Sequence, residues 1–288
     1  MDFIYYLDNE TLSTPEIISQ QTGIAADVLN NILIVFLIIY KVRKGNEEVK
    51  DFHEPIFRQL FHIAGSIVVF RNLLWTMLLL KLDGIITFLV VLLWSVDNLL
   101  VDTTLMLTFL AAFQRIVIMY WPKWKHLVTG KPLTWTITAV WLLTLSQFII
   151  KSVFTIQNQR DLSFNPVTIS FRLLFFLSTI ASNLIYHHFY KLMSNFTDQH
   201  QYHQMHLLYQ FIPIHTILTI FTFTQLIIEL LLLVDKNNKF YLEIYYSSGV
   251  FLTPFIPTVI SLSYIASRDN LRALITAVMR PIWEDITG

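Results

Sequence analysis

The chain has 288 residues, of which 55% are hydrophobic, 15% aromatic and 14% charged. A soluble domain carries closer to about a quarter of charged residues, so this composition favours a membrane protein over one or two soluble domains. The chain has 20 basic and 20 acidic residues, so it has no excess of positive charge that would indicate nucleic-acid binding. Cysteine is absent, which excludes disulfides and thiolate chemistry.

Seven apolar windows, each long enough to cross a bilayer, follow one another along the chain. They cover residues 18–41, 56–80, 86–120, 133–154, 167–192, 207–234 and 239–266. The third window is longer than a bilayer requires, so we expect its helix to be tilted or to extend past the interface. We therefore predict an all-α membrane protein, in which a seven-transmembrane helix bundle occupies residues 18–266.

The distribution of lysine and arginine predicts the orientation of this bundle. With the N-terminus outside, twelve of these residues lie in or next to the inner loops and tail, and five lie in or next to the outer loops. The remaining three, Arg71, Arg115 and Arg172, lie further inside their windows. Residues 1–17 are then an extracellular tail whose glycosylation sequon at Asn9 is predicted to be used, while the sequon at Asn195 lies inside. Apolar residues at helical spacing in 267–288 predict a short cytoplasmic amphipathic helix and tail on the inner leaflet.

One arginine, Arg115, lies near the inner end of the third span. Its position alone fits an interfacial arginine that snorkels to the headgroups as well as it fits a functional residue. Its neighbours favour a functional residue, because Gln114 precedes Arg115 and Pro122 follows it by seven residues. Pro122 opens a loop that runs to Lys131.

This arrangement resembles rhodopsin-type G-protein-coupled receptors, in which an Asp/Glu-Arg-Tyr motif ends the third helix and a proline often follows seven residues after the arginine. The Gln-Arg form with its aromatic, proline-containing continuation is similar to nematode serpentine chemoreceptors, and most of all to their Srz class. Pro213 in span six and Pro257 and Tyr264 in span seven are partial matches to family positions. Span two lacks the family aspartate and Ile256 stands where the family has asparagine, which favours a divergent chemosensory branch.

The resemblance implies a multi-pass receptor of the plasma membrane, on sensory cilia, that acts in olfaction and signal transduction. A small odorant or peptide would bind in the outer half of the bundle, and a heterotrimeric G protein would bind at the inner side. Residues implied in coupling and activation are Gln114, Arg115, Pro122, Pro213, Pro257 and Tyr264. We expect neither a cofactor nor a metal, and we expect no enzymatic activity.

Asp97 is the first candidate for contact with the ligand. It stands eighteen residues before Arg115, which is about five helical turns and about 27 Å along the axis, so both residues share one face. In amine receptors of the family an aspartate at this spacing pairs with a cationic ligand. The structural alternatives are an ion pair with Arg71 or Lys151, or solvation in an open vestibule.

Trp94 and Asn98 lie within about one turn of Asp97 and are candidates for the same pocket, although the position of Trp94 fits a packing residue equally well. Glu229, in the outer half of span six, either lines this cavity or sits near the interface. Asp102 falls on a different face of span three and is expected to pair with a neighbouring span. Arg172, near the outer end of span five, is interpreted as a snorkelling arginine.

Other functional classes find less support in the sequence. The histidines at 187–188 and 200–206 do not converge on one face of a helix as metal ligands would, and a solvated loop explains them better. No catalytic set of residues accompanies them. Span seven has no lysine between Phe240 and Ala266 for a retinal Schiff base. An inverted seven-span ligand-gated odorant channel is opposed by the charge bias, and a transporter would need a repeat or a discontinuous helix pair.

Overall fold

The computed structural model describes residues 14–44, 55–79, 85–157, 166–193, 199–235, 240–241, 244 and 253–266. This part of the chain is helical and contains no strand. Its elements are α2 (Thr14–Lys44), α3 (Pro55–Leu79), α4 (Ile85–Tyr120), the 3₁₀ helix η2 (Pro122–Leu127), α5 (Gly130–Gln157), α6 (Pro166–Met193), α7 (Gln199–Val234) and α9 (Phe255–Ala266).

Six of the described helices have both the length and the apolar composition needed to cross a membrane. They are α2 to α7, and they coincide with the first six predicted spans, although α2 begins at Thr14 and α7 at Gln199. Within the seventh predicted span the structure gives α9, whose 12 residues extend about 18 Å, less than the roughly 30 Å of a hydrocarbon core. Most of 239–254, all of 267–288, Asn9 and Asn195 lie outside the described residues, so the seventh span, the amphipathic helix and the glycosylation remain predictions.

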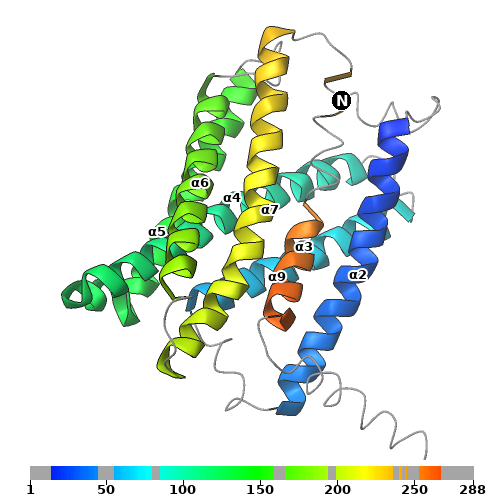
Figure 1. Ribbon diagram of the computed structural model, residues 1–288. Coiled ribbons are helices and arrows are strands. Elements are labelled where there is room, and N and C mark those ends of the chain that lie inside the picture. The colour runs from blue at the N-terminus through cyan, green and yellow to red at the C-terminus, as the bar shows by residue number, and fades with distance from the viewer. Residues whose placement is uncertain are drawn as a thin grey trace, which may run out of the picture.

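The centre of the bundle is α4. Buried residues make up 61% of the candidate span of α4, against 28–44% in the other five spans. The helix contacts α3, α5, α6 and α7. In Figure 1, α3 and α4 run obliquely to α6 and α7, which lie side by side, while α5 lies at the edge. The 36 residues of α4 extend about 54 Å, which is longer than the roughly 30 Å of a hydrocarbon core. Whether α4 accommodates this length by tilting or by extending past the interface stays a prediction.

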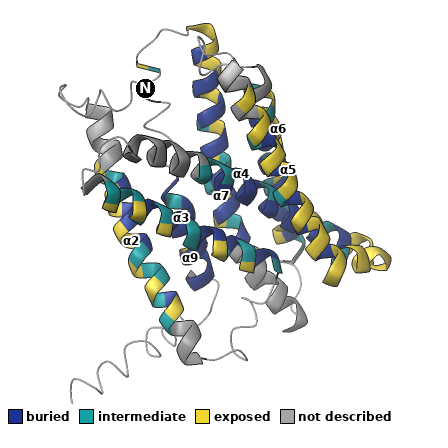
Figure 2. Cartoon of the chain, turned by 180° about the vertical axis from the view of Figure 1, so that it is seen from behind, coloured by how far each residue is buried: buried dark blue, intermediate teal, exposed yellow. Residues whose placement is uncertain are grey.

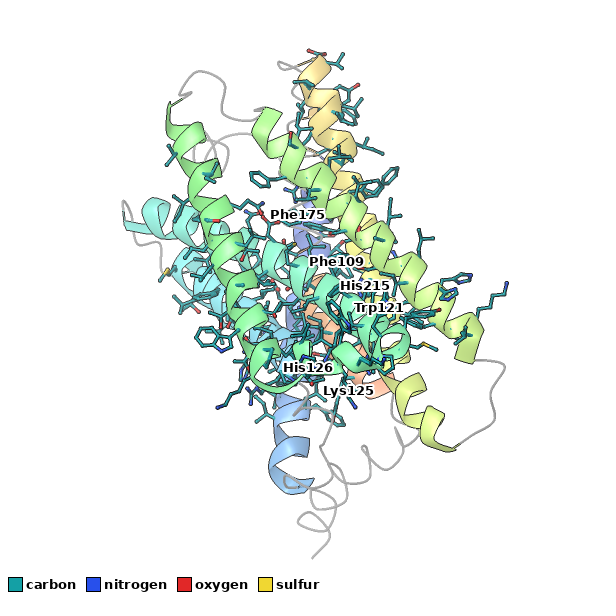
Figure 3. All side chains as sticks on the ribbon, turned by 90° about the vertical axis from the view of Figure 1, so that its left-hand side faces the viewer. Phe109, Trp121, Lys125, His126, Phe175 and His215 are labelled. Carbon is teal, nitrogen blue, oxygen red and sulfur yellow. The ribbon has the colours of Figure 1, made fainter. Side chains whose placement is uncertain are left out.

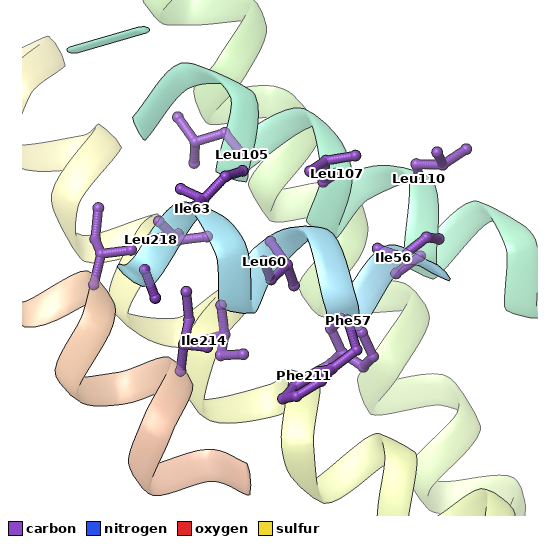
Figure 4. Packing of buried hydrophobic residues seen from close by; sticks show 14 of the residues in the cluster. Ile56, Phe57, Leu60, Ile63, Leu105, Leu107, Leu110, Phe211, Ile214 and Leu218 are labelled. Atoms are coloured by element: carbon purple, nitrogen blue, oxygen red, sulfur yellow. The ribbon is translucent and has the colours of Figure 1, made fainter. Parts of the chain in front are cut away.

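The apolar core forms where α3 passes between α4 and α7 (Figure 4). Phe57 is fully buried there, with its ring centroid 6.3 Å from that of Phe211 in an edge-to-face arrangement and 5.6 Å from that of Tyr264. Aliphatic side chains from the same three helices fill the space around these rings: Ile56, Leu60, Ile63, Leu105, Leu107, Leu110, Ile214 and Leu218.

The long helices have one side buried in the bundle and one side exposed (Figure 2). Many polar side chains lie on the buried sides beside the apolar core, and the exposed sides carry many large aliphatic residues. The buried stripe of α6 follows helical spacing and consists of Arg172, Phe175, Thr179, Ser182, Tyr186 and Phe189, whereas its exposed side carries Leu173, Leu174, Leu177 and Leu184. Between α6 and α7, hydroxyl groups of Thr179 and Thr222 lie 3.3 Å apart. Outward aliphatics and inward hydrogen-bonding groups are what a lipid environment favours, since lipid tails give helices no hydrophobic reason to associate.

Candidate functional site

The end of α4 that carries Arg115 is fastened to the segment that follows it. The buried side chain of Gln114 donates from Nε2 to the carbonyl oxygen of Val128 at 3.0 Å. Arg115 is half-buried beside it. Gln114 therefore holds the loop after α4 in place through a main-chain hydrogen bond, a role that its sequence position did not reveal.

Pro122 begins the next element for a local reason. Proline lacks a backbone N–H and fits the first turn of a helix, so α4 ends at Tyr120 and η2 starts at Pro122. Hydrogen bonds from Trp124 N to Trp121 O at 2.8 Å and from Val128 N to Lys125 O at 3.2 Å close the 3₁₀ turns. Gly130 then takes a positive φ of 63°, a conformation that suits glycine, and α5 begins.

The same end of α4 also contacts α6. The hydroxyl group of Tyr120 lies 2.5 Å from Nε2 of His188, and the Tyr120 ring stacks at 6.3 Å on that of Phe189. This contact joins α4 and α6 beside Arg115. A displacement of either helix at this end would break it.

A buried polar cluster lies toward the opposite end of the bundle. Arg172 Nε is 3.2 Å from Oε1 of Glu229, and Arg172 Nη1 is 3.9 Å from Oδ1 of Asp102. Gln147 Nε2 donates to Oδ2 of Asp102 at 3.4 Å. We call these four residues, one each from α4, α5, α6 and α7, the Arg172 cluster. One guanidinium between two carboxylates gives the three ionised groups a formal charge of −1.

The cluster corrects the interpretation of Arg172 as a snorkelling arginine. Its side chain is 9% exposed and Glu229 is 1% exposed, because both belong to the buried faces of helices that pack along their length. Arg172 lies on the stripe that continues through Phe175, which Figure 3 shows in the upper part of the bundle, away from Trp121 and Lys125. The expectation that Asp102 pairs with a neighbouring helix is confirmed.

The predicted ligand-contact residues divide into two groups. Glu229 is fully buried in the Arg172 cluster, five residues before the end of α7. Asn98 is half-buried on α4, four residues before Asp102. Trp94 and Asp97 are on the same helix, but their side chains lie outside the described part.

A second buried ion pair joins α2 and α3. Arg71 donates from Nε and Nη2 to the two carboxylate oxygens of Asp27 at 2.6 and 2.8 Å, and Trp75 Nε1 donates to Asp27 Oδ2 at 2.9 Å. Arg71, one of the two expected ion-pair partners of Asp97, pairs with Asp27 of α2 in the structure. Sequence reasoning missed Asp27, although an aspartate inside an apolar window is itself a signal.

The predicted activation residues of the last two helices lie in different surroundings. Pro213 lies inside α7 with its side chain exposed, and the helix continues through it. Pro257 is buried in the first turn of α9, and Tyr264 is buried near the end of α9 against Phe57.

The described histidines form no group of three or more metal-binding side chains with one another or with carboxylates. His187 and His188 have exposed side chains. His215, labelled in Figure 3, is fully buried on α7 with its ring centroid 4.7 Å from that of Tyr186. Comparison of the chain with family models, with curated proteins and with solved structures found no match.

Proposed function

We propose that this membrane protein is a G-protein-coupled chemosensory receptor, with its N-terminus outside. The observation that carries the proposal is the placement of two polar sites on one central helix. The Arg172 cluster joins four helices at Asp102, near the middle of α4, and Gln114, Arg115 and the Tyr120–His188 contact lie near its C-terminal end, where Gln114 is about 18 Å from Asp102 along the axis. A ligand that rearranges the first site would act on α4 and α6, which both reach the second.

The chemistry of the Arg172 cluster suits a ligand with a cationic or hydrogen-bonding group. Two carboxylates share one guanidinium, so an amine that approached Glu229 or Asp102 would compete with Arg172 for them. Because these groups are buried, each ion contact is stronger than it would be in water. We propose a small odorant or peptide carrying such a group, with Asn98, one helical turn before Asp102, beside it. Trp94 and Asp97 stay candidates for ligand contact by sequence alone.

Activation would be a shift between two arrangements of the bundle, and the ligand would bind the active one more tightly. Pro213 removes one main-chain hydrogen bond from α7, which makes this position the natural pivot for an outward movement of the helix. That movement would open the inner end of the bundle around Arg115 and the η2 loop. The Gα subunit would bind there, as the resemblance to the receptor family implies.

Replacement of Arg115 tests the coupling role. The protein in nanodiscs, with purified Gα, is measured for basal nucleotide exchange and for exchange in the presence of a panel of small amines. We expect Arg115→Ala to abolish exchange while leaving surface expression unchanged, and we expect Lys191→Ala, an exposed lysine at the inner end of α6, to retain it. Exchange that survives in Arg115→Ala would reduce this arginine to an interfacial anchor.

Topology separates this proposal from its rivals. A glycosidase shift that disappears in Asn9→Gln, together with a C-terminal tag that is stained only after permeabilisation, is the expected result. A glycan on Asn195 or an exposed C-terminus would mean an inverted bundle. Recordings for an odorant-gated channel, or uptake assays for a transporter, would then replace the exchange assay.

A further inference from the structure

The segment that follows α4 is the most exposed aromatic part of the described chain. Every residue of η2 and Trp121 before it are exposed. The indoles of Trp121, Trp124 and Trp135 are 55%, 61% and 75% exposed, and Figure 2 shows this end of α5 projecting beyond its neighbours. Three large exposed indoles at one end of a helical bundle need an environment that suits both an apolar ring and a polar N–H.

The same segment carries only positive charge. Lys123 and Lys125 flank Trp124 in η2, and Lys131 follows in the first turn of α5. All three lysines are exposed. No aspartate or glutamate occurs between positions 103 and 160 of the chain. We call Trp121, Lys123, Trp124, Lys125, Leu127, Lys131 and Trp135 the Trp/Lys patch. Figure 3 shows Trp121, Lys125 and His126 in this region.

The patch is continuous with a surface that faces hydrocarbon. Trp135 and Leu142 are seven residues apart on α5, about two helical turns, so they lie on one side of the helix. Leu142, Leu143, Leu145 and Ile149 extend this exposed aliphatic side away from the patch. The level at which aliphatic side chains give way to tryptophan and lysine is where a bilayer passes from tails to headgroups.

We propose that the Trp/Lys patch is a binding site for anionic phospholipid headgroups. The indoles would lie at the headgroup level, and the three ammonium groups would contact phosphate and carboxylate oxygens. Because Gln114 fastens Val128 to α4, a lipid held by the patch also holds the inner end of α4 in position. The patch shares the η2 segment with the surface proposed for the Gα subunit, but its test measures lipid binding and not nucleotide exchange, so either proposal can fail without the other.

The test compares the full chain in nanodiscs of phosphatidylcholine with the chain in nanodiscs that also contain phosphatidylserine. Co-purified lipids are counted by native mass spectrometry after transfer to detergent, and short-chain phosphatidylserine is titrated into the detergent-solubilised protein. We expect selective retention of phosphatidylserine. We expect Lys123→Gln/Lys125→Gln/Lys131→Gln to weaken its binding by at least about tenfold, since each lysine near an anionic surface contributes about fivefold.

Two controls isolate the cause. The charge-conserving triple variant, with arginine at 123, 125 and 131, should bind as wild type does, and so should Lys151→Gln, twenty residues along α5. For the wild-type chain, raising the ionic strength should release phosphatidylserine and leave phosphatidylcholine unaffected, which tests the proposal even if the glutamine variant fails to fold. Equal retention of both lipids, unchanged binding by the glutamine variant, or tighter binding of an acidic peptide than of phosphatidylserine would overturn it.

Discussion

Replacing Arg172 by methionine should destabilise the protein more than any other single change at the cluster. The substitution keeps an apolar side chain of similar length but removes the guanidinium from two carboxylates, of which Glu229 is 1% and Asp102 12% exposed. Breaking a buried ion pair by removing one partner costs about 3–5 kcal/mol, because the remaining charge stays buried. The matched control is Leu174→Met on the outward side of α6, where we expect a change below about 0.5 kcal/mol.

A second substitution separates charge from packing. Adding Glu229→Gln to Arg172→Met removes the carboxylate closest to the lost guanidinium, so the double variant should be more stable than Arg172→Met alone. The free energy of unfolding is measured by reversible denaturation in mixed detergent micelles, followed by circular dichroism. If Arg172→Met unfolds within about 0.5 kcal/mol of wild type, or if the two substitutions are simply additive, the cluster is not the coupled network described above.

Two further substitutions test contacts at the other sites. Gln114→Ala should lower the free energy of unfolding by about 1–3 kcal/mol, because the carbonyl of Val128 loses its donor. Amide hydrogen exchange should become faster in residues 121–129 and stay constant in α7. Unchanged protection in both segments would refute the anchoring role of Gln114. Arg71→Met should cost about 3–5 kcal/mol, since it leaves Asp27 with Trp75 as its remaining described donor. Asp27→Asn should restore part of this loss in the same unfolding assay, and further destabilisation on its addition would contradict the pairing.

The sequence sufficed to locate the six long helices, because each is a continuous apolar window and the bilayer fixes its minimum length. It did not suffice to pair their polar residues. Helical spacing tells which residues share a face, as for Asp97 and Arg115, but it does not tell which helix that face meets. Arg172 looked like an interfacial arginine because it lies near the end of its window, whereas its actual surroundings depend on the packing of α6 against α7.

One signal in the sequence could have found these pairs. In a lipid-embedded helix the large aliphatic residues mark the outward side, so the polar residues opposite them face the bundle. On α2, Ile24, Val28, Ile32 and Val35 are exposed, and Asp27 and Asn30 are buried on the other side. Asn30 accordingly donates to the carbonyl of Pro254 at 2.7 Å, while its neighbour Asn31 exchanges hydrogen bonds with Asn72. Reading the aliphatic side first would have singled out both buried residues.

Two of the buried ion pairs join helices that are successive along the chain, and this has a consequence for biogenesis. Asp27 and Arg71 come from α2 and α3, and Arg172 and Glu229 from α6 and α7. A lone arginine entering the hydrocarbon is costly, but a helical hairpin that enters with its own carboxylate carries a neutralised pair. We therefore expect the insertion machinery to release α2 with α3, and α6 with α7, as preassembled units. A variant that lacks one carboxylate should then already fail during synthesis, as an arginine-bearing helix retained at the translocon.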